Sequence, residues 1–173
     1  ALEFSYQSRP ALESLRTHEI CTQAKIPVYH IQYPLALTRS ATEKTFALTE
    51  SNAIYYSLAA GFAHACGAKY VIAGQIRTDW YPLTSNSLNA QPEHYSELNN
   101  IISKEYEKGA PRILVPFAYF DKQKVCEIGL QLGAPLELTW SCPNSSEKAC
   151  GVCSQCLERG KTFAVLGIGE RNV

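Results

Sequence analysis

The chain has 173 residues, 46% of them hydrophobic and 18% charged, and its formal net charge is zero. This composition is typical of one ordinary globular domain with a real core, and no apolar run is long enough to predict a membrane-spanning helix. A neutral chain also lacks the basic surplus of most nucleic-acid-binding proteins, so direct binding to DNA or RNA is not expected.

Strands and helices alternate along the first part of the chain. Residues 1–6 predict a strand, residues 11–25 carry apolar side chains at helical spacing, and residues 26–33 are short and β-rich. Residues 34–44 are polar and predict a loop without regular structure. Residues 49–66 predict a strong helix that Thr49 or Ser51 can cap and that Gly67 ends in the left-handed conformation.

The alternation continues in the second part. Residues 69–74 predict a buried strand of parallel type, since they form a continuous apolar run that ends in glycine. A long loop over 76–92 leads to a helix over 93–108, and residues 112–116 predict another strand. Residues 121–132 predict a helix with Asp121 as its N-cap and Gly133 after its end. Residues 136–140 lead into a cysteine-rich loop, and residues 157–166 predict a closing helix packed over it.

This order of elements favours an α/β fold with a parallel, doubly wound sheet, because right-handed crossovers bury both faces of such a sheet. Ligands of these folds bind beyond the carboxyl ends of the strands. Four segments should therefore meet at one site: 6–9, 33–38, 74–79 and 116–122. Gly74, at a strand end, would let a ligand approach the backbone closely. We expect one domain over 1–173, with a metal-binding loop and closing helix at 141–167 inside it.

Four of the seven cysteines, Cys142, Cys150, Cys153 and Cys156, follow the spacing C-x7-C-x2-C-x2-C. A C-x-x-C step lets two thiolates from one tight turn reach one ion, and four soft donors suit the tetrahedral zinc ion. Unrelated buried thiols or a disulfide pair are the alternatives. With sulfur at all four corners, the metal is expected to be structural and not catalytic.

The other cysteines, Cys21, Cys66 and Cys126, fall on predicted apolar helix faces and are expected to be small core residues. Reduced thiols, a zinc site and the lack of a recognisable secretion signal favour a cytoplasmic protein.

Several segments carry a resemblance that extends from Phe4 to Phe163. They are TFAL-x-x-x-N before an alanine-rich helix, KYVIAG-x-x-x-x-D, FDKQKV-x-x-IGLQLGAPLELTWSC and CGVCSQCLERGKTF, of which the last two are the most specific. Together they resemble the 7-cyano-7-deazaguanine synthase (QueC-like) family, whose fold is similar to that of other N-type ATP pyrophosphatases (adenine nucleotide alpha hydrolase-like). The resemblance implies an ATP-dependent ligase of the queuosine pathway that converts 7-carboxy-7-deazaguanine and ammonia to the nitrile. It also implies ATP with Mg²⁺ as cofactor and structural zinc on the four cysteines.

The same resemblance implies ligand-facing positions. Tyr6 and Arg9 match a family tract that faces the active site, and Asn52, Asp79 and Lys122 match further positions near the ligand. Simpler interpretations stay open: Arg9 could pair with Glu13 one helical turn later, and Asp79 could be a solvated turn residue. Lys122 lies in a first helical turn, where the helix dipole disfavours a cation, and this favours an anionic partner such as phosphate. No catalytic residue is assigned.

The sequence also departs from the family pattern. The family's phosphate-binding loop, S-G-G-x-D-S, should precede Ala1 and does not occur in the sequence, so we expect either a truncated sequence or another chain that supplies this part. Ser5, Pro10 and Ser51 stand where the family has Asp, His and Arg. These departures leave open a divergent QueC-like protein with another substrate, such as those of bacterial defence systems, and a partner-dependent, non-catalytic zinc module. A homodimer is also left open.

Overall fold

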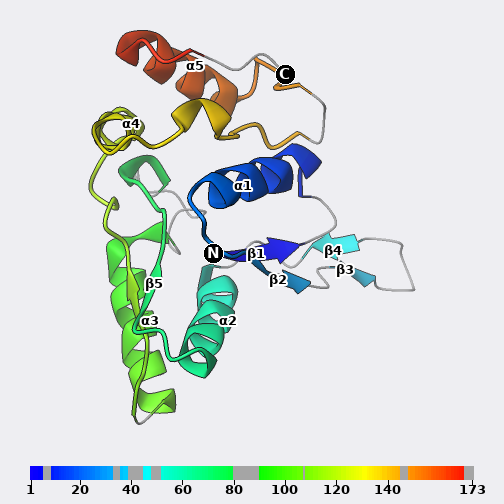
Figure 1. Ribbon diagram of the computed structural model, residues 1–173. Helices are drawn as coiled ribbons and strands as arrows, with labels where there is room; N and C mark the ends of the chain where they lie inside the picture. Colours follow the sequence, from blue (N-terminus) through cyan, green and yellow to red (C-terminus); the bar gives the residue numbers. More distant parts are fainter. Residues whose placement is uncertain are drawn as a thin grey trace. The chain divides into compact units, whose positions relative to one another are not determined.

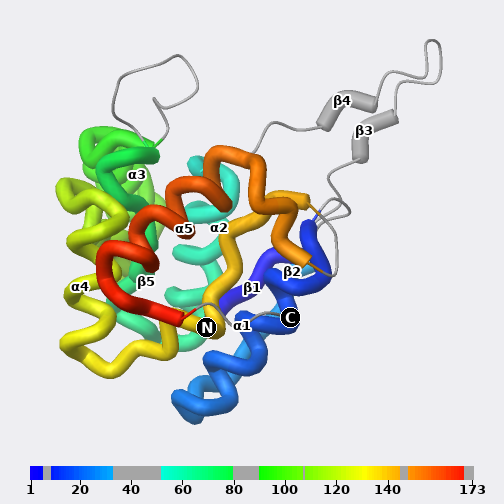
Figure 2. The backbone as a smooth tube through the Cα atoms, turned by 90° about the horizontal axis from the view of Figure 1, so that it is seen from above, coloured from blue at the N-terminus to red at the C-terminus, as the bar shows by residue number. Residues whose placement is uncertain are grey.

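The computed structural model, drawn in Figures 1 and 2, consists of two compact units, residues 1–47 with 126–173 and residues 48–125. It describes residues 1–5, 9–32, 36–38, 45–47, 52–79, 90–106, 108–144 and 148–169. The expected roles of Tyr6, Thr49 and Ser51 therefore lie outside the described residues.

The first unit begins with a strand–helix–strand motif: β1 (Leu2–Ser5), α1 (Ala11–Gln23) and β2 (Tyr29–Gln32). The two strands lie side by side and parallel, with Leu2 opposite Tyr29 and Ser5 opposite Gln32. This confirms the elements predicted over 1–33, although β2 begins three residues later than the predicted strand. A parallel pair with a helical crossover is the unit from which α/β folds are built.

The loop predicted over 34–44 is wrong in part. β3 (Ala36–Thr38) and β4 (Thr45–Ala47) pair antiparallel, with Leu37 opposite Phe46. Each strand has only three residues. A run of this length is too short to show the period-two pattern by which a strand is recognised.

The chain returns to the first unit through α4 (Lys122–Gln131), which begins in the second unit, followed by the 3₁₀ turn η3 (Leu136–Leu138) and α5 (Ser154–Leu166). η3 contacts α1. α5 begins three residues before the predicted helix because Cys153 caps it, its side chain accepting from the amide of Cys156. Gly167 ends α5 in the left-handed conformation.

The second unit contains α2 (Asn52–Ala65), β5 (Tyr70–Ile72), the 3₁₀ turn η1 (Arg77–Asp79), α3 (Pro92–Glu105) and β6 (Arg112–Leu114). β5 and β6 pair in parallel, with Val71 opposite Ile113. The helices and this strand pair share a core made of Ala60, Ala73, Tyr95, Leu98, Ile102 and Ile113. Gly67 adopts positive φ two residues after the end of α2, as predicted. α3 ends at Glu105, three residues before the predicted end at 108, and Gly109, four residues later, also has positive φ.

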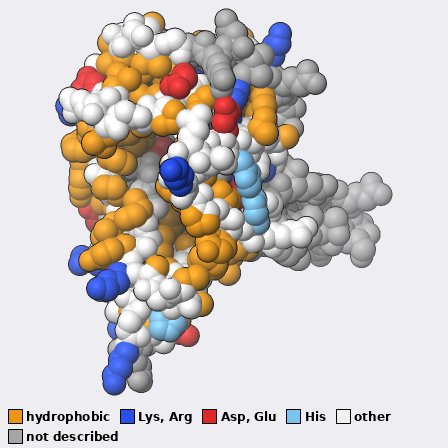
Figure 3. Space-filling model, viewed as in Figure 1, with side chains coloured by type: hydrophobic (Ala, Val, Ile, Leu, Met, Phe, Trp, Pro, Cys, Tyr) orange, Lys and Arg blue, Asp and Glu red, His pale blue; other side chains and the backbone are white. Residues whose placement is uncertain are grey.

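Burial of β5 differs from the prediction. Val71 packs against the core, but Tyr70 and Ile72 are 58% and 64% exposed. The helices of the second unit pack on one face of the strand pair, so the other face keeps its apolar side chains at the surface. Figure 3 shows hydrophobic side chains over much of the face in view. The expectation for Cys66 is also wrong: it follows the last residue of α2 and is exposed, whereas Cys21 and Cys126 are buried as predicted.

The structure is thus a mixed α/β protein with parallel strand pairs. Among the described residues, the strands form three two-stranded sheets, of which β1–β2 and β5–β6 are parallel and β3–β4 is antiparallel. The doubly wound sheet stays a prediction. Among the described residues, no helix has the length and apolar character needed to cross a membrane.

Candidate functional site

The four cysteines of the C-x7-C-x2-C-x2-C motif come together at the start of α5. Their Sγ atoms all lie within 4.8 Å of one another, and none is in a disulfide. Four sulfurs at about 2.3 Å from one tetrahedral ion would lie about 3.8 Å apart. The Sγ atoms of Cys150 and Cys156 are 3.9 Å apart, so the group could hold a metal ion such as zinc.

Backbone amides shape this group. The amide of Cys150 donates to Sγ of Cys142 at 3.5 Å, that of Cys153 to Cys150 at 3.4 Å, and that of Cys156 to Cys153 at 3.4 Å. Gly151, with φ of 73°, makes the turn that aims these amides inward. Donors of this kind stabilise thiolate, the form of cysteine that binds metal.

The thiols do not ionise alike. The backbone amides of Val152 and Cys153 lower the pKa of Cys150 to about 6, whereas burial raises the pKa of Cys156 to about 12. A dication bound by all four sulfurs would therefore displace a proton from Cys156.

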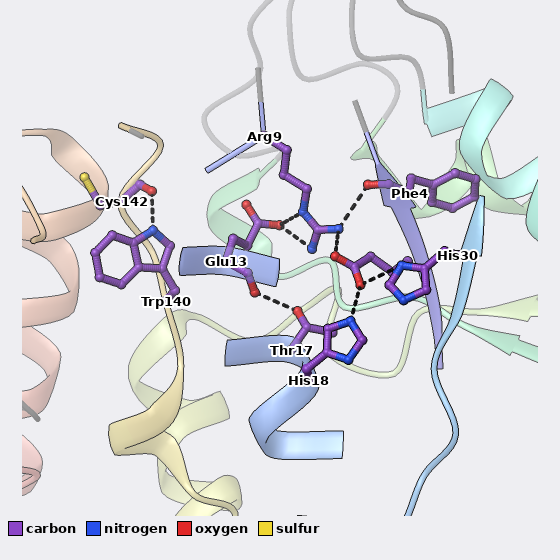
Figure 4. A network of polar contacts seen from close by, with 9 residues as sticks. Phe4, Arg9, Glu13, Thr17, His18, His30, Trp140 and Cys142 are labelled. Carbon is purple, nitrogen blue, oxygen red and sulfur yellow. Dashed lines mark hydrogen bonds and ion pairs between the residues drawn. The ribbon is translucent and has the colours of Figure 1, made fainter. Parts of the chain in front are cut away.

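Neighbouring side chains fix the first cysteine and the helix. Trp140 Nε1 donates to the carbonyl of Cys142 at 2.7 Å (Figure 4), and Cys142 is only 2% exposed. Arg159 on α5 donates to Oγ1 of Thr139 at 2.6 Å and stacks 3.9 Å from the centroid of Phe163. A cavity of about 570 Å³ lies beside the cluster and is lined by Arg16, Thr139, Trp140, Cys142, Cys156 and Arg159, among others.

In the second unit, the structure brings together two of the strand-end segments predicted to meet. The amide of Arg77, after β5, donates to the carbonyl of Phe120, after β6, at 2.8 Å. The Arg77 guanidinium also reaches Asp121 at 3.3 Å. Asp121 caps α4 as predicted, accepting from the amide of Lys124 at 2.9 Å, and Lys122 is the first residue of that helix.

Gly74 and Asp79 lie in the segment after β5. A Cβ added at Gly74 would meet no atom within 4 Å among the described residues, which leaves this backbone open to a ligand. Asp79 accepts from the amide of Ile76 at 2.8 Å, the bond expected of a turn residue.

The sequence analysis did not predict a role for Tyr56 or Gln75, two polar side chains near Gly74 and Asp79. Tyr56 donates to Oε1 of Gln75 at 2.8 Å, and burial raises its pKa, with the charge of Asp79 adding to the shift. Tyr56 lies one turn after Asn52, the first residue of α2. The four-residue spacing from Asn52 places Tyr56 on the same helix face, and this could have predicted a polar role for it. Tyr56 fits an apolar helix face equally well, so the spacing alone did not decide.

Arg9, in the first unit, is held on both sides by carboxylates (Figure 4). Its guanidinium pairs with Glu3 and with Glu13, the second at 3.1 Å, and donates to the carbonyl of Phe4 at 3.0 Å. The pairing with Glu13 is the simpler interpretation considered for this arginine.

The comparisons with known proteins agree with this architecture. A family model described as "Queuosine biosynthesis protein QueC" matches residues 1–167. Similar curated proteins are called 7-cyano-7-deazaguanine synthase. The one from Acidobacterium capsulatum is 32% identical over 65% of this chain and 47% of its own length. The one from Thermoplasma acidophilum is 35% identical over 67% and 48%, and the one from Nostoc punctiforme is 33% identical over 68% and 52%.

The chain thus spans about half the length of the curated relatives that it matches. The family match nevertheless covers nearly all of the chain, including every cysteine of the metal-ligand group. The chain belongs to the QueC family.

Proposed function

We propose that this chain acts in the synthesis of 7-cyano-7-deazaguanine, as an ATP-dependent carbon–nitrogen ligase. The observation that carries the proposal is the QueC family match over residues 1–167. The synthase name of the relatives from three organisms supports it.

In the proposed reaction, the carboxylate of 7-carboxy-7-deazaguanine attacks the α-phosphorus of ATP and pyrophosphate leaves. Ammonia then attacks the acyl adenylate and releases AMP, which gives the amide. A second ATP adenylates the amide oxygen with release of pyrophosphate, and loss of that oxygen as AMP together with the two amide protons gives the nitrile. Chemistry of this kind needs the protein mainly to position the reactants and to stabilise developing charge.

We propose that the four-cysteine group holds zinc in a structural role. Cys142, Cys150, Cys153 and Cys156 supply only sulfur, so a bound ion would keep no open corner for water or substrate. The ion would tie the segment before α5 to the first turn of that helix.

We propose that ATP with Mg²⁺ binds near Asn52, Gly74, Asp79 and Lys122. Gly74 has open space at its backbone, and Lys122 begins a helix where an anion is stabilised. On the substrate side we propose Tyr6 and Arg9, with Arg9 oriented by its two carboxylate partners. Two further parts of the proposal are the doubly wound sheet and a cytoplasmic location, the latter supported by seven free cysteines.

The test uses the protein expressed from its complete reading frame and loaded with zinc. With ATP, Mg²⁺, ammonium and 7-carboxy-7-deazaguanine, we expect AMP and the nitrile product, measured by chromatography and mass spectrometry. Lys122→Gln should lower kcat/KM by about 10- to 100-fold, the effect of one lost charge-assisted hydrogen bond. Lys124→Gln, in the same first turn, is the matched control. Absence of both AMP and nitrile from the folded, zinc-loaded protein would contradict the proposal.

A further inference from the structure

A second group of metal-ligand side chains lies in the first unit, away from the cysteines in sequence. It consists of Glu3 on β1, His18 on α1 and His30 on β2. Figure 4 labels the two histidines. Each side chain comes from a different element of the strand–helix–strand motif. Their ligand atoms lie within 4.8 Å of one another.

The spacing of the ligand atoms fits a small metal ion. Oε2 of Glu3 lies 3.3 Å from Nε2 of His18 and 3.2 Å from Nδ1 of His30. Nitrogen and oxygen donors about 2.0–2.2 Å from one tetrahedral ion would lie about 3.3–3.5 Å apart. The two imidazole rings are stacked, with centroids 4.9 Å apart and 15° between their planes, so one ring would turn about its Cβ–Cγ bond to share an ion with the other.

Glu3 is the observation that points to a ligand. Its side chain is 1% exposed, and among the described residues its Oε2 accepts no hydrogen bond, although both imidazole nitrogens are near. A buried carboxylate oxygen needs a positive charge or a hydrogen-bond donor beside it. A proton on one of the two imidazoles, as in the two ion pairs, or a metal ion bound by all three side chains would supply it.

Arg9 explains how the carboxylate is oriented. Its guanidinium pairs with the other oxygen of Glu3, Oε1, and with the carbonyl of Phe4. This leaves Oε2 directed at the two histidines. Partners that hold a ligand carboxylate in place are the usual outer shell of a metal site.

The histidines give the ion a way in. Their side chains are 44% and 46% exposed, so an ion can enter from solvent and water can complete its coordination. Two imidazoles and one carboxylate are the donors of zinc and of other first-row divalent transition metals, not those preferred by Mg²⁺ or Ca²⁺.

We propose that Glu3, His18 and His30 bind one divalent first-row transition-metal ion, zinc or a metal of similar preference, and so cross-link β1, α1 and β2. This site is separate from the four cysteines, which supply only sulfur. It does not depend on the proposed reaction.

The test is metal binding by the purified protein expressed from its complete reading frame. We expect two zinc ions per chain by atomic absorption after loading and desalting, and one in the double variant His18→Gln, His30→Asn. His64→Gln, a histidine change in the second unit, is the matched control and should keep two. Because the two ligand histidines are half-exposed, the variants should fold, and circular dichroism checks this.

Cobalt(II) distinguishes the two sites by spectrum. The cysteine site gives thiolate-to-metal charge transfer, whereas the Glu3 site gives only weak ligand-field bands. In Cys153→Ser protein, which lacks a complete sulfur site, the ligand-field bands of the Glu3 site should remain, and the histidine double variant should remove them. One ion per chain in the parent protein, or two in the histidine double variant, would overturn the proposal.

Discussion

The side-chain amide of Asn99 forms two hydrogen bonds with the backbone of Ile113. Its Nδ2 donates to the carbonyl at 3.0 Å, and its Oδ1 accepts from the amide at 2.8 Å. On the other edge of β6, the amide of Arg112 donates to Lys69 and the carbonyl of Leu114 accepts from Ala73. Asn99 thus takes the place of a neighbouring strand along the outer edge of β6, and it ties α3 to the sheet.

We expect Asn99→Ala to lower the free energy of unfolding by about 2 kcal/mol, because a buried amide and carbonyl would lose their partners together. Ile113 is only 2% exposed, so water cannot readily replace them. Urea unfolding measures the change. Asn100→Ala, one residue later on the exposed side of α3, is the control and should have little effect. Alanine favours a helix more than asparagine does, so helix propensity cannot cause a loss in either variant. An equal loss in both would contradict the assignment of the effect to the pair of bonds.

Tyr95 provides a second prediction, on pH. It is 1% exposed, and its hydroxyl has no hydrogen-bond partner among the described residues. Burial, followed by the nearby Tyr56, raises the pKa of Tyr95. A raised folded pKa means that the folded protein keeps a proton that the unfolded chain loses above its normal tyrosine pKa of about 10. Stability is therefore unaffected below that pH and falls as the pH rises above it.

Tyr95→Phe should weaken this alkaline loss and leave neutral-pH stability unchanged or about 1 kcal/mol higher, because it removes an unpartnered buried oxygen. Tyr56→Phe is the matched variant and should cost about 1 kcal/mol at neutral pH, since it removes the bond to Gln75. Unfolding curves at neutral and alkaline pH separate the two. Destabilisation of Tyr95→Phe equal to that of Tyr56→Phe would show that the Tyr95 hydroxyl has a partner.

Local signals predicted much of the fold. Asp121 caps α4, Gly67 and Gly133 adopt positive φ, and the cysteine spacing predicted the group that the structure assembles. Each of these features depends on residues close together in sequence, so spacing and residue type are enough to recognise it.

Features that join distant segments could not be predicted in this way. Asn99 and Ile113 come from different elements, as do Glu3, His18 and His30, and no local pattern relates them. The prediction that β5 is buried failed for a related reason. An apolar run predicts a strand, but it does not tell whether one or both faces of that strand are covered by other elements.

Lys25 provides a third prediction, on the backbone. It is a non-glycine residue with φ of 55°, and it follows Ala24, the C-cap of α1. A side chain in this left-handed conformation costs about 1–2 kcal/mol relative to glycine. Lys25→Gly should therefore raise the free energy of unfolding by up to about 1 kcal/mol, since glycine also loses more entropy on folding. Gly67→Ala, at φ of 68°, should have the opposite sign. Thermal melts test both, and a lower melting temperature for Lys25→Gly would contradict the argument.

The last prediction concerns metal at the four cysteines. Cys153→Ser removes one of the four sulfurs but leaves a hydroxyl oxygen that can still cap α5, as Sγ of Cys153 does by accepting from the amide of Cys156. The change therefore tests the metal ligand and not the cap. We expect loss of zinc from the sulfur site and a less stable C-terminal segment, measured by atomic absorption and by faster amide exchange in α5.

Cys66→Ser, at an exposed cysteine outside the group, is the control and should keep the metal. Because zinc binds thiolates, protons compete with it, and its affinity should fall as the pH is lowered. The high pKa of Cys156 places this competition at neutral pH as well, since that thiol must give up its proton to bind. Zinc affinity that does not change with pH, or full zinc retention by Cys153→Ser at the sulfur site, would show that the four sulfurs do not act together on one ion.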